Sequence, residues 1–258
     1  MTRHLALEGV DNFRDYGDYA AARGRRLKPG RLYRSASHGR ATQNDLAAIA
    51  ALDLAVIVDL RRKGERLRDP SLRHQGFAGV LIDNDLGDDE PDPWHVHIRE
   101  SDLSETSFRG YLLEYYRVAP FKARHIDLFS RYFRALAHAQ GPVLIHCAAG
   151  KDRTGILAAL THHLAGVSAD DITADYLLTN NPARLAMRMP MVAKAIEEIA
   201  GRIPSEAALR TALGVEAIYL EAAFAAIAQR YGDTAAYLEQ ALGVDQTLRA
   251  ALEARLLE

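Results

Sequence analysis

Short apolar runs alternate with amphipathic stretches along the first two thirds of the chain. Residues 55–60, 79–82 and 141–145 are apolar and partly β-branched, which is typical of buried strands. Between these runs, residues 42–52 and 121–136 carry apolar side chains at helical spacing. Alternating strands and helices favour an α/β fold with a central, mainly parallel sheet flanked by helices.

The last third of the chain changes to a purely helical pattern. A capping sequence begins at Ser168, Pro182 follows two asparagines at a helix boundary, and apolar stripes continue to the end of the chain. Pro190 is expected to break or kink the helix that contains it. No linker separates the two parts, so we predict one domain over residues 1–258 in which residues 168–258 form a helical cap.

Composition narrows the class of protein. The chain has 258 residues, is 48% hydrophobic and carries a formal net charge of −2. No apolar run approaches the ~20 residues needed to cross a bilayer, so we expect no membrane span. The charge gives no broad basic field, so nucleic acid is not an expected partner.

The cysteine count and the first residues favour the cytoplasm as the compartment. One cysteine excludes an internal disulfide, and the start of the chain lacks the apolar core of a signal peptide. Export by a route without a signal peptide stays open.

The only cysteine lies in a ten-residue string between the strand at 141–145 and a helix that continues to Gly166. Because the string joins a strand to the start of a helix, its backbone N–H groups lack helical partners, and the helix dipole adds roughly half a positive charge there. Ligands of open α/β sheets bind at the carboxyl ends of strands. We therefore predict a phosphate cradle in residues 148–153 of the string His146-Cys147-Ala148-Ala149-Gly150-Lys151-Asp152-Arg153-Thr154-Gly155.

Cys147 and Arg153 are the candidates for the chemistry. A lone cysteine is more often a small buried hydrophobe than a catalyst. Here helix-start amides and a guanidinium would favour the thiolate, which is the nucleophilic form. The planar fork of Arg153 could hold two phosphoryl oxygens and neutralise the charge that develops on them. The pattern predicts that Cys147 is a nucleophile toward phosphorus.

The string resembles the His-Cys-x-x-Gly-Lys-x-Arg-Thr-Gly signature of the cysteine-dependent protein tyrosine phosphatase superfamily. Lys151 with Asp152 is similar to a bacterial branch with mycobacterial members that is related to both tyrosine and phosphoinositide phosphatases. The resemblance covers most of the chain and implies a cysteine-phosphatase fold and a cysteinyl-phosphate intermediate. Its weaker strings agree in order, at residues 12–15, 32–35, 58–61 with Glu65, and 231–238.

Three more residues of the string each have two interpretations. His146 could satisfy backbone groups at the strand end, whereas the resemblance implies that it shapes the loop and tunes the thiolate. Thr154 could have a capping role at the start of the helix, whereas the resemblance implies that its hydroxyl contacts the cysteine sulfur and assists hydrolysis of the phosphoenzyme. Lys151 could point to solvent, or its ammonium could add a second positive charge to the cradle and favour phosphoinositides as well as phosphopeptides.

The departing alkoxide needs a proton donor. Asp152 is the favoured candidate, although its cationic neighbours could hold it as a structural carboxylate. Asp59, at a strand end, could donate a proton or could hold Arg61 or Arg153 in place. The third candidate is an acidic stretch that reads Pro-Asp-Pro-Trp where conventional tyrosine phosphatases have Trp-Pro-Asp; its acids are Asp83, Asp85, Asp88, Asp89, Glu90 and Asp92.

Residues 83–117 follow these acids with aromatic and apolar side chains. They could form a loop and helix that close over the site as a lid, which would protect the thiolate from oxidation and restrict substrate size. The alternative is a solvated loop that leads into an ordinary packed helix. His95 and His97 suggest a metal, but no second cluster completes a site and cysteine-based phosphoryl transfer needs no metal. We expect no metal and no cofactor.

The sequence as a whole predicts a phosphatase for phosphate monoesters. The expected substrates are phosphotyrosine proteins, with phosphoserine, phosphothreonine and phosphoinositides as further candidates. Two other classes stay open: a phosphate- or phosphoinositide-binding module without turnover, and a sulfurtransferase or arsenate-reductase-like cysteine enzyme. The absence of a second, resolving cysteine argues against a self-contained dithiol reductase. The pattern assigns no oligomeric state.

Overall fold

The computed structural model describes residues 3–258. Met1 and Thr2 lie outside the described residues; they are the first residues of the predicted domain and of the segment in which no signal peptide was predicted. Within this range the strands form a single five-stranded sheet in the order β1-β2-β5-β3-β4. Only β1 is antiparallel to its neighbour, so the sheet is mainly parallel, as predicted. The strands are β1 (Arg14–Asp15), β2 (Leu32–Ser35), β3 (Val56–Asp59), β4 (Val80–Ile82) and β5 (Val143–His146).

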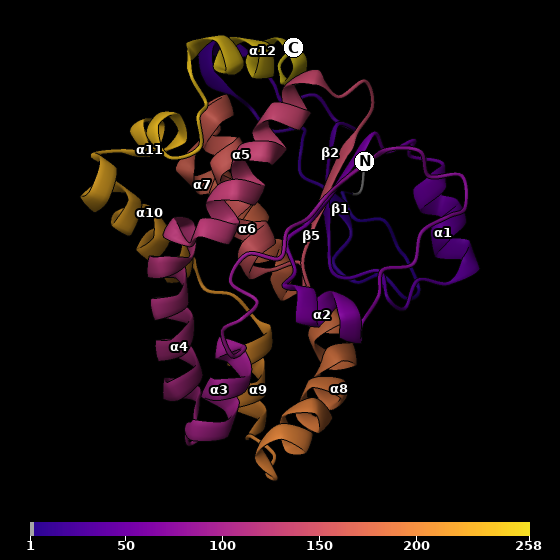
Figure 1. The fold of residues 1–258 in the computed structure, drawn as a ribbon, viewed down its shortest axis with the longest axis vertical. Coiled ribbons are helices and arrows are strands. Elements are labelled where there is room, and N and C mark those ends of the chain that lie inside the picture. The colour runs from indigo at the N-terminus through magenta and orange to yellow at the C-terminus, as the bar shows by residue number, and fades with distance from the viewer. Residues whose placement is uncertain (1–2) are drawn as a thin grey trace.

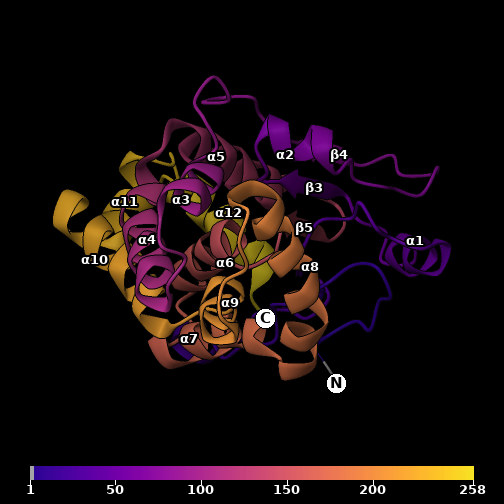
Figure 2. The same ribbon diagram turned by 90° about the horizontal axis from the view of Figure 1, so that it is seen from below.

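Helices surround this sheet. They are α1 (Gln43–Ala50), α2 (Lys63–Arg68), α3 (Pro93–Glu100), α4 (Glu105–Val118), α5 (Ala123–His138), α6 (Asp152–Ala165), α7 (Ala169–Leu177), α8 (Pro182–Ala200), α9 (Glu206–Leu213), α10 (Ala217–Tyr231), α11 (Thr234–Gln240) and α12 (Gln246–Leu256), with short 3-10 turns η1 (Ala22–Gly24), η2 (Ala119–Phe121) and η3 (Leu178–Asn180). Helix α1 lies on one side of the sheet and α5 and α6 on the other, while α3, α4, α8 and α9 extend beyond its lower end (Figure 1). The view from below shows these four helices grouped around that end (Figure 2).

Strands β3 and β5 are buried on both faces along their whole length, which explains their continuous apolar runs. Val56 and Val58 of β3 pack into the larger core with α5 and α6, whereas Ile57 between them packs into the core under α1. The same alternation places Ile145 of β5 in the larger core and Leu144 in the smaller one. The period of two along each strand therefore fixes which face of the sheet every side chain enters.

The register of the three central strands positions the candidate site. His146, the last residue of β5, pairs with Ser35 of β2 on one side and with Asp59 of β3 on the other. The chain after His146 therefore leaves the sheet between the ends of two parallel neighbours. This is the crevice in which open α/β sheets bind ligands, and it lies at the end of the sheet from which α3, α4, α8 and α9 extend.

Most predicted elements are confirmed, including the capping box at the start of α1, where Thr42 and Asp45 exchange hydrogen bonds. Of the two effects expected at Pro190, the break is wrong, because α8 continues through this residue from Pro182 to Ala200, and the kink stays a prediction. A proline removes one helical hydrogen bond, but packing of the helix can offset that loss. Helix α8 packs against α9, and Ile196 on it is buried in a small core with residues of α3, α4 and α9.

The last third is helical, as predicted, and shares its core with the sheet. Tyr219, Leu238 and Leu252 belong to the same buried cluster as Val58 and Ile145. Among the helices of residues 3–258, none on its own has the length and apolar character to cross a membrane; α9 and α10 together meet both criteria, but they are bent by 45° relative to each other.

Candidate active site

The loop from Cys147 to Lys151 turns sharply before α6 begins at Asp152. Cys147 is buried at the end of β5, with 2% of its surface exposed. Gly150 has a φ of +65°, and a Cβ built on it would lie 2.5 Å from the carbonyl oxygen of Ser35. Only glycine combines this conformation with so close an approach to a neighbouring backbone. Glycine at position 150 is therefore required by the shape of the turn.

Buried side chains hold the carbonyl groups of this loop. The side-chain amide of Asn12 donates to the Gly150 carbonyl at 2.9 Å, and Arg34 donates to the same oxygen at 3.1 Å. Arg184 of α8 donates to the Ala149 carbonyl at 3.2 Å. In the described part of the chain, no hydrogen bond uses the backbone N–H groups of residues 148–151. This arrangement leaves the N–H groups available to an anion, as the predicted cradle requires.

Glu65 positions the guanidinium of Arg153. It accepts from Nη2 at 2.7 Å and from Nη1 at 2.5 Å, while Nη1 also donates to the Leu60 carbonyl at 3.2 Å. Burial alone would raise the pKa of Glu65, but the charge and hydrogen bonds of Arg153 outweigh it and lower the pKa to about 2. The pair is therefore ionised at neutral pH, and its two parallel hydrogen bonds fix the plane of the fork.

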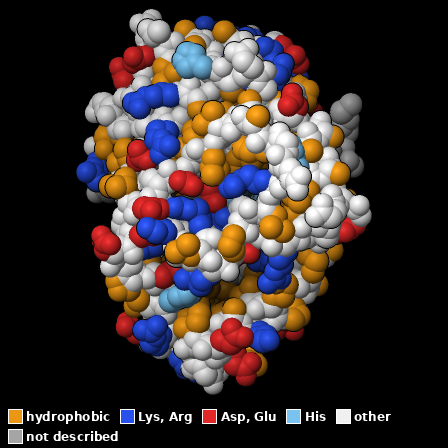
Figure 3. All heavy atoms as spheres, turned by 45° about the vertical axis from the view of Figure 1, so that its right-hand side comes forward, with side chains coloured by type: hydrophobic (Ala, Val, Ile, Leu, Met, Phe, Trp, Pro, Cys, Tyr) orange, Lys and Arg blue, Asp and Glu red, His pale blue; other side chains and the backbone are white. Residues whose placement is uncertain are grey.

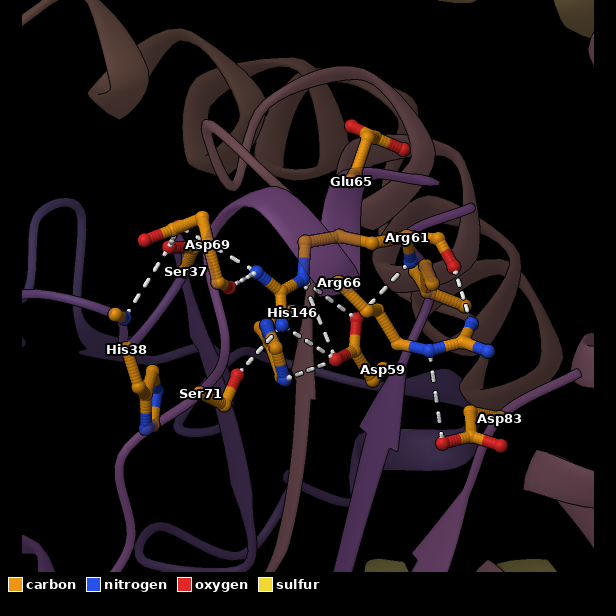
Figure 4. A network of polar contacts seen from close by, with 12 residues as sticks. Ser37, His38, Asp59, Arg61, Glu65, Arg66, Asp69, Ser71, Asp83 and His146 are labelled. Carbon is orange, nitrogen blue, oxygen red and sulfur yellow. Dashed lines mark hydrogen bonds and ion pairs between the residues drawn. The ribbon is translucent and has the colours of Figure 1, made fainter. Parts of the chain in front are cut away.

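Asp59 and His146 form a network behind the loop (Figure 4). Arg61 donates to both carboxylate oxygens of Asp59, at 2.9 Å from Nε and 2.8 Å from Nη2. Burial acts to raise the pKa of Asp59, but His146 and Arg61 hold it well below its ordinary value. Asp59 thus pairs with Arg61, one of the two structural roles considered for it, and not with Arg153, whose partner is Glu65.

His146 lies between Asp59 and His38. Its Nε2 is 3.6 Å from the Asp59 carboxylate, and its ring stacks on that of His38 with centroids 5.0 Å apart. Burial lowers the pKa of His146 in spite of the nearby carboxylate, which favours the neutral ring at pH 7. His146 thus contacts Asp59 and His38 at the end of β5, and the shaping role that the resemblance implies stays a prediction.

Asp152 receives a hydrogen bond at the first position of α6. The hydroxyl of Tyr116 on α4 donates to its Oδ1 at 3.0 Å, and this hydroxyl lies 2.6 Å from that of Tyr176 on α7. Burial raises the pKa of Tyr116 well above its ordinary value, so the phenol keeps its proton. Lys151 lies 3.5 Å from the same carboxylate oxygen. These contacts fix the orientation of the carboxyl group.

Lys151 is buried rather than solvated. Its ammonium donates to the carbonyls of Ala212, at 2.7 Å, and Gly214, at 3.2 Å, where α9 ends. The hydroxyl of Thr154 is also buried and makes no hydrogen bond within residues 3–258. The roles that the resemblance implies for these two side chains stay predictions.

One cavity of about 260 Å³ brings the reactive residues together. Cys147, Asp152 and Arg153 line it with the loop backbone, and aromatic side chains of α3 and α4 form part of its wall, namely Trp94, Tyr111 and Tyr115. Residues of α8 and α9 complete this wall, including Val192 and Leu213, which the predicted lid of residues 83–117 did not include. Figure 3 shows one face of the molecule, on which Lys and Arg lie among Asp and Glu rather than in a continuous basic surface.

The acidic stretch contributes one residue to the cavity wall, Asp92. Asp92 also caps α3 by accepting from the N–H of Trp94 at 3.1 Å. Three other acids of the stretch do not line the cavity and form ion pairs: Asp83 with Arg66, Asp85 with Lys63, and Asp88 with Arg62. Of the proton-donor candidates, Asp92 and Asp152 line the cavity, whereas Asp59, whose pKa is lowered, does not line it.

Comparison with known proteins agrees with this geometry. The model of a family described as the tyrosine phosphatase family matches residues 5–258. The chain belongs to this family. It is 34% identical to the triple specificity protein phosphatase PtpB of Mycobacterium tuberculosis, over 93% of this chain and 94% of that protein. It is 35% identical to a Cupriavidus necator protein that is provisionally named a tyrosine-protein phosphatase, over 94% of this chain and 86% of that protein.

Membership of the tyrosine phosphatase family explains the weaker strings of the sequence. Asn12, from the first string, and Arg34, from the second, both bind the carbonyl of Gly150. Glu65, which follows the third, binds Arg153. In the sequence these residues stand out only by the order of their strings, and the structure shows that each of the three contacts the loop or its arginine.

Proposed function

We propose that this phosphatase hydrolyses phosphotyrosine through a cysteinyl phosphate on Cys147. The observation that carries the proposal is that Cys147, Arg153 and Asp152 line one cavity with the unbonded amides of the loop. The sulfur attacks phosphorus, and the bond between phosphorus and the phenolic oxygen breaks. Asp152 then gives its proton to the departing phenolate, and Arg153 and the amides bind the phosphoryl oxygens.

Hydrolysis of the intermediate regenerates the enzyme. The oxygen of a water molecule attacks phosphorus, the sulfur–phosphorus bond breaks, and the carboxylate of Asp152 takes the proton of the water. The hydroxyl of Thr154 would assist this step. The hydrogen bond from Tyr116 supports this assignment of Asp152, because it holds the carboxyl group in place at the rim of the cradle.

Aromatic walls favour an aryl phosphate as substrate. Trp94, Tyr111 and Tyr115 offer flat apolar faces against which the ring of a phosphotyrosine can pack. Phosphoserine, phosphothreonine and phosphoinositides are the further substrates of the proposal, and a triple specificity phosphatase is among the relatives. The buried charge of Lys151 next to the loop would favour the more highly phosphorylated ligands.

The test is phosphate release by wild type and by two variants. Cys147→Ser should abolish the release, whereas a module without turnover would release none even as wild type. Asp152→Asn should slow hydrolysis of phosphotyrosine by about 100-fold or more and slow an aryl phosphate with a good leaving group far less. Equal slowing of both substrates would contradict the role of Asp152, and the same pair of assays on Asp92→Asn would then test the other carboxylate of the cavity.

The same proposal covers the organisation of the chain. Residues 1–258 would act as one phosphatase domain, with residues 168–258 as its helical cap. Residues 83–117 would form part of a lid, and α8 and α9 would complete its wall. Cysteine content favours the cytoplasm as the compartment.

A further inference from the structure

Helix α5 begins at the cavity without a capping group. Its N-cap residue is Lys122, whose side chain makes no capping hydrogen bond, and its first turn holds no acidic residue. Lys122, Arg124 and His125 all line the cavity. Helix starts usually carry an acceptor or an acid, because the positive end of the dipole disfavours cations. The start of α5 has the opposite composition, which suits an anion that comes from outside the chain.

Arg124 is the second observation that points to a ligand. Arg124 is only 6% exposed, and its buried Nε and Nη2 make no hydrogen bond within residues 3–258. Other buried arginines of the protein have carboxylate partners: Arg34 pairs with Asp175 and Arg61 with Asp59. An enclosed guanidinium without a partner is unfavourable, so an anion that enters the cavity would supply the missing contact.

The carboxylates near Arg124 are already engaged. Glu65 binds both terminal nitrogens of Arg153, and Asp88 pairs with Arg62. Burial and the positive charge of Arg153 lower the pKa of Arg124 to about 10, which leaves the guanidinium protonated at neutral pH. Arg124 is therefore a charged group that faces a shared cavity with no anion of the protein to satisfy it.

We propose that Arg124, with Lys122 and the start of α5, binds a second acidic group on the substrate molecule whose phosphate occupies the Cys147 loop. Both positions line one cavity of about 260 Å³, so a single small ligand can reach them together. The inference rests on the proposed function and specifies its substrate. The aromatic walls favour a phosphotyrosine peptide in which the residue beside the phosphotyrosine carries a carboxylate.

Lys151 is a weaker candidate for this contact. The sequence suggested its ammonium as the second positive charge of the cradle, but two carbonyls at the end of α9 engage it. The guanidinium of Arg124 has no such partner and offers several donors in one plane. Arg124 on α5 is therefore the stronger candidate for direct contact with a second acidic group, whereas Lys151 would contribute its charge from beside the loop.

The experiment measures the binding of two peptides to the Cys147→Ser variant by calorimetry. The peptides contain one phosphotyrosine and differ only in Asp or Asn at the neighbouring position. We expect the Asp peptide to bind more tightly, and Arg124→Gln to reduce the ratio of the two affinities by about tenfold, since a hydrogen bond to a charged group is worth about 1.5–3 kcal/mol. Arg124→Lys should restore part of the ratio, which a merely structural effect would not do.

Arg117→Gln is the matched control, because this arginine on α4 is exposed, forms an ion pair with Glu114 and does not line the cavity. Adding Arg117→Gln to the Cys147→Ser variant should leave the ratio of the two peptide affinities unchanged. Equal affinity for the two peptides, or a ratio that Arg124→Gln does not change, would overturn the inference. A greater effect of Arg124→Gln on a soluble inositol bisphosphate than on the Asp peptide would overturn the choice of a peptide. Phosphate release by wild type, measured separately, decides the proposed function itself.

Discussion

Glu65→Gln removes the charge that positions Arg153 and keeps the shape of the side chain. In the folded protein the pKa of Glu65 falls from 4.5 to about 2, because Arg153 outweighs the effect of burial. At about 1.4 kcal/mol per pH unit, this difference means that the ionised pair stabilises the fold by about 3 kcal/mol at neutral pH. The variant should lose an amount of this order, because the guanidinium stays buried without its counter-charge.

The pH dependence of this loss tests the origin of the effect. A carboxyl whose pKa is lower in the folded state stabilises the fold fully above its unfolded value, near pH 4.5, and loses that contribution as the pH falls toward 2. The difference in unfolding free energy between wild type and Glu65→Gln, measured in urea, should be about 3 kcal/mol at pH 7 and about half of that at pH 3. A difference that is the same at both values would refute this reasoning.

The same variant should also lose activity. Without the ionised pair, Arg153 is no longer held in one plane, so we expect kcat/KM for an aryl phosphate to fall by about 10- to 100-fold. Glu114→Gln on α4 is the matched control, since Glu114 is exposed and its ion pair is with Arg117, outside the cavity. It should change neither the stability nor the rate. Full activity of Glu65→Gln would mean that Arg153 does not need this partner.

Three further changes test the loop. Gly150→Ala should lower the unfolding free energy by about 1–3 kcal/mol, because it combines a positive φ with a Cβ 2.5 Å from the Ser35 carbonyl; unchanged urea unfolding would contradict the turn. Asn12→Ala should cost about 1–2 kcal/mol and reduce kcat/KM several-fold, since the Gly150 carbonyl loses a donor; a normal rate would show that this support is dispensable. Lys151→Ala should weaken phosphoinositide turnover more than phosphotyrosine turnover, and the reverse order would argue against lipid substrates.

Local sequence patterns predict many of the helices and strands. The apolar runs at β3 and β5 are strands because their side chains alternate between two cores, one on each face of the sheet. The start of α1 was predictable, because Thr42 and Asp45 satisfy each other's backbone groups within one turn. The loop around Cys147 was also predictable from local sequence, because the end of β5, Gly150 and the start of α6 are adjacent along the chain.

Contacts between distant segments could not be derived from these patterns. Glu65 reaches Arg153 from 88 residues away, and nothing in the spacing of either residue chooses this pair over Asp59 with Arg153. The walls that α8 and α9 add to the cavity, and the unpartnered state of Arg124, likewise depend on how helices pack in three dimensions. Pro190 shows the converse, because a strong local signal for a break was overridden in a helix that packs against α9.

In the proposed reaction, the phosphoryl group is transferred to the sulfur of Cys147. The measurement is mass spectrometry of enzyme that is denatured with detergent at alkaline pH during turnover of an aryl phosphate and then digested at alkaline pH. We predict one phosphoryl group on the peptide that contains Cys147, absent from the Cys147→Ser variant. Steady release of phosphate with no modified peptide, or with the phosphoryl group on another residue, would contradict the account.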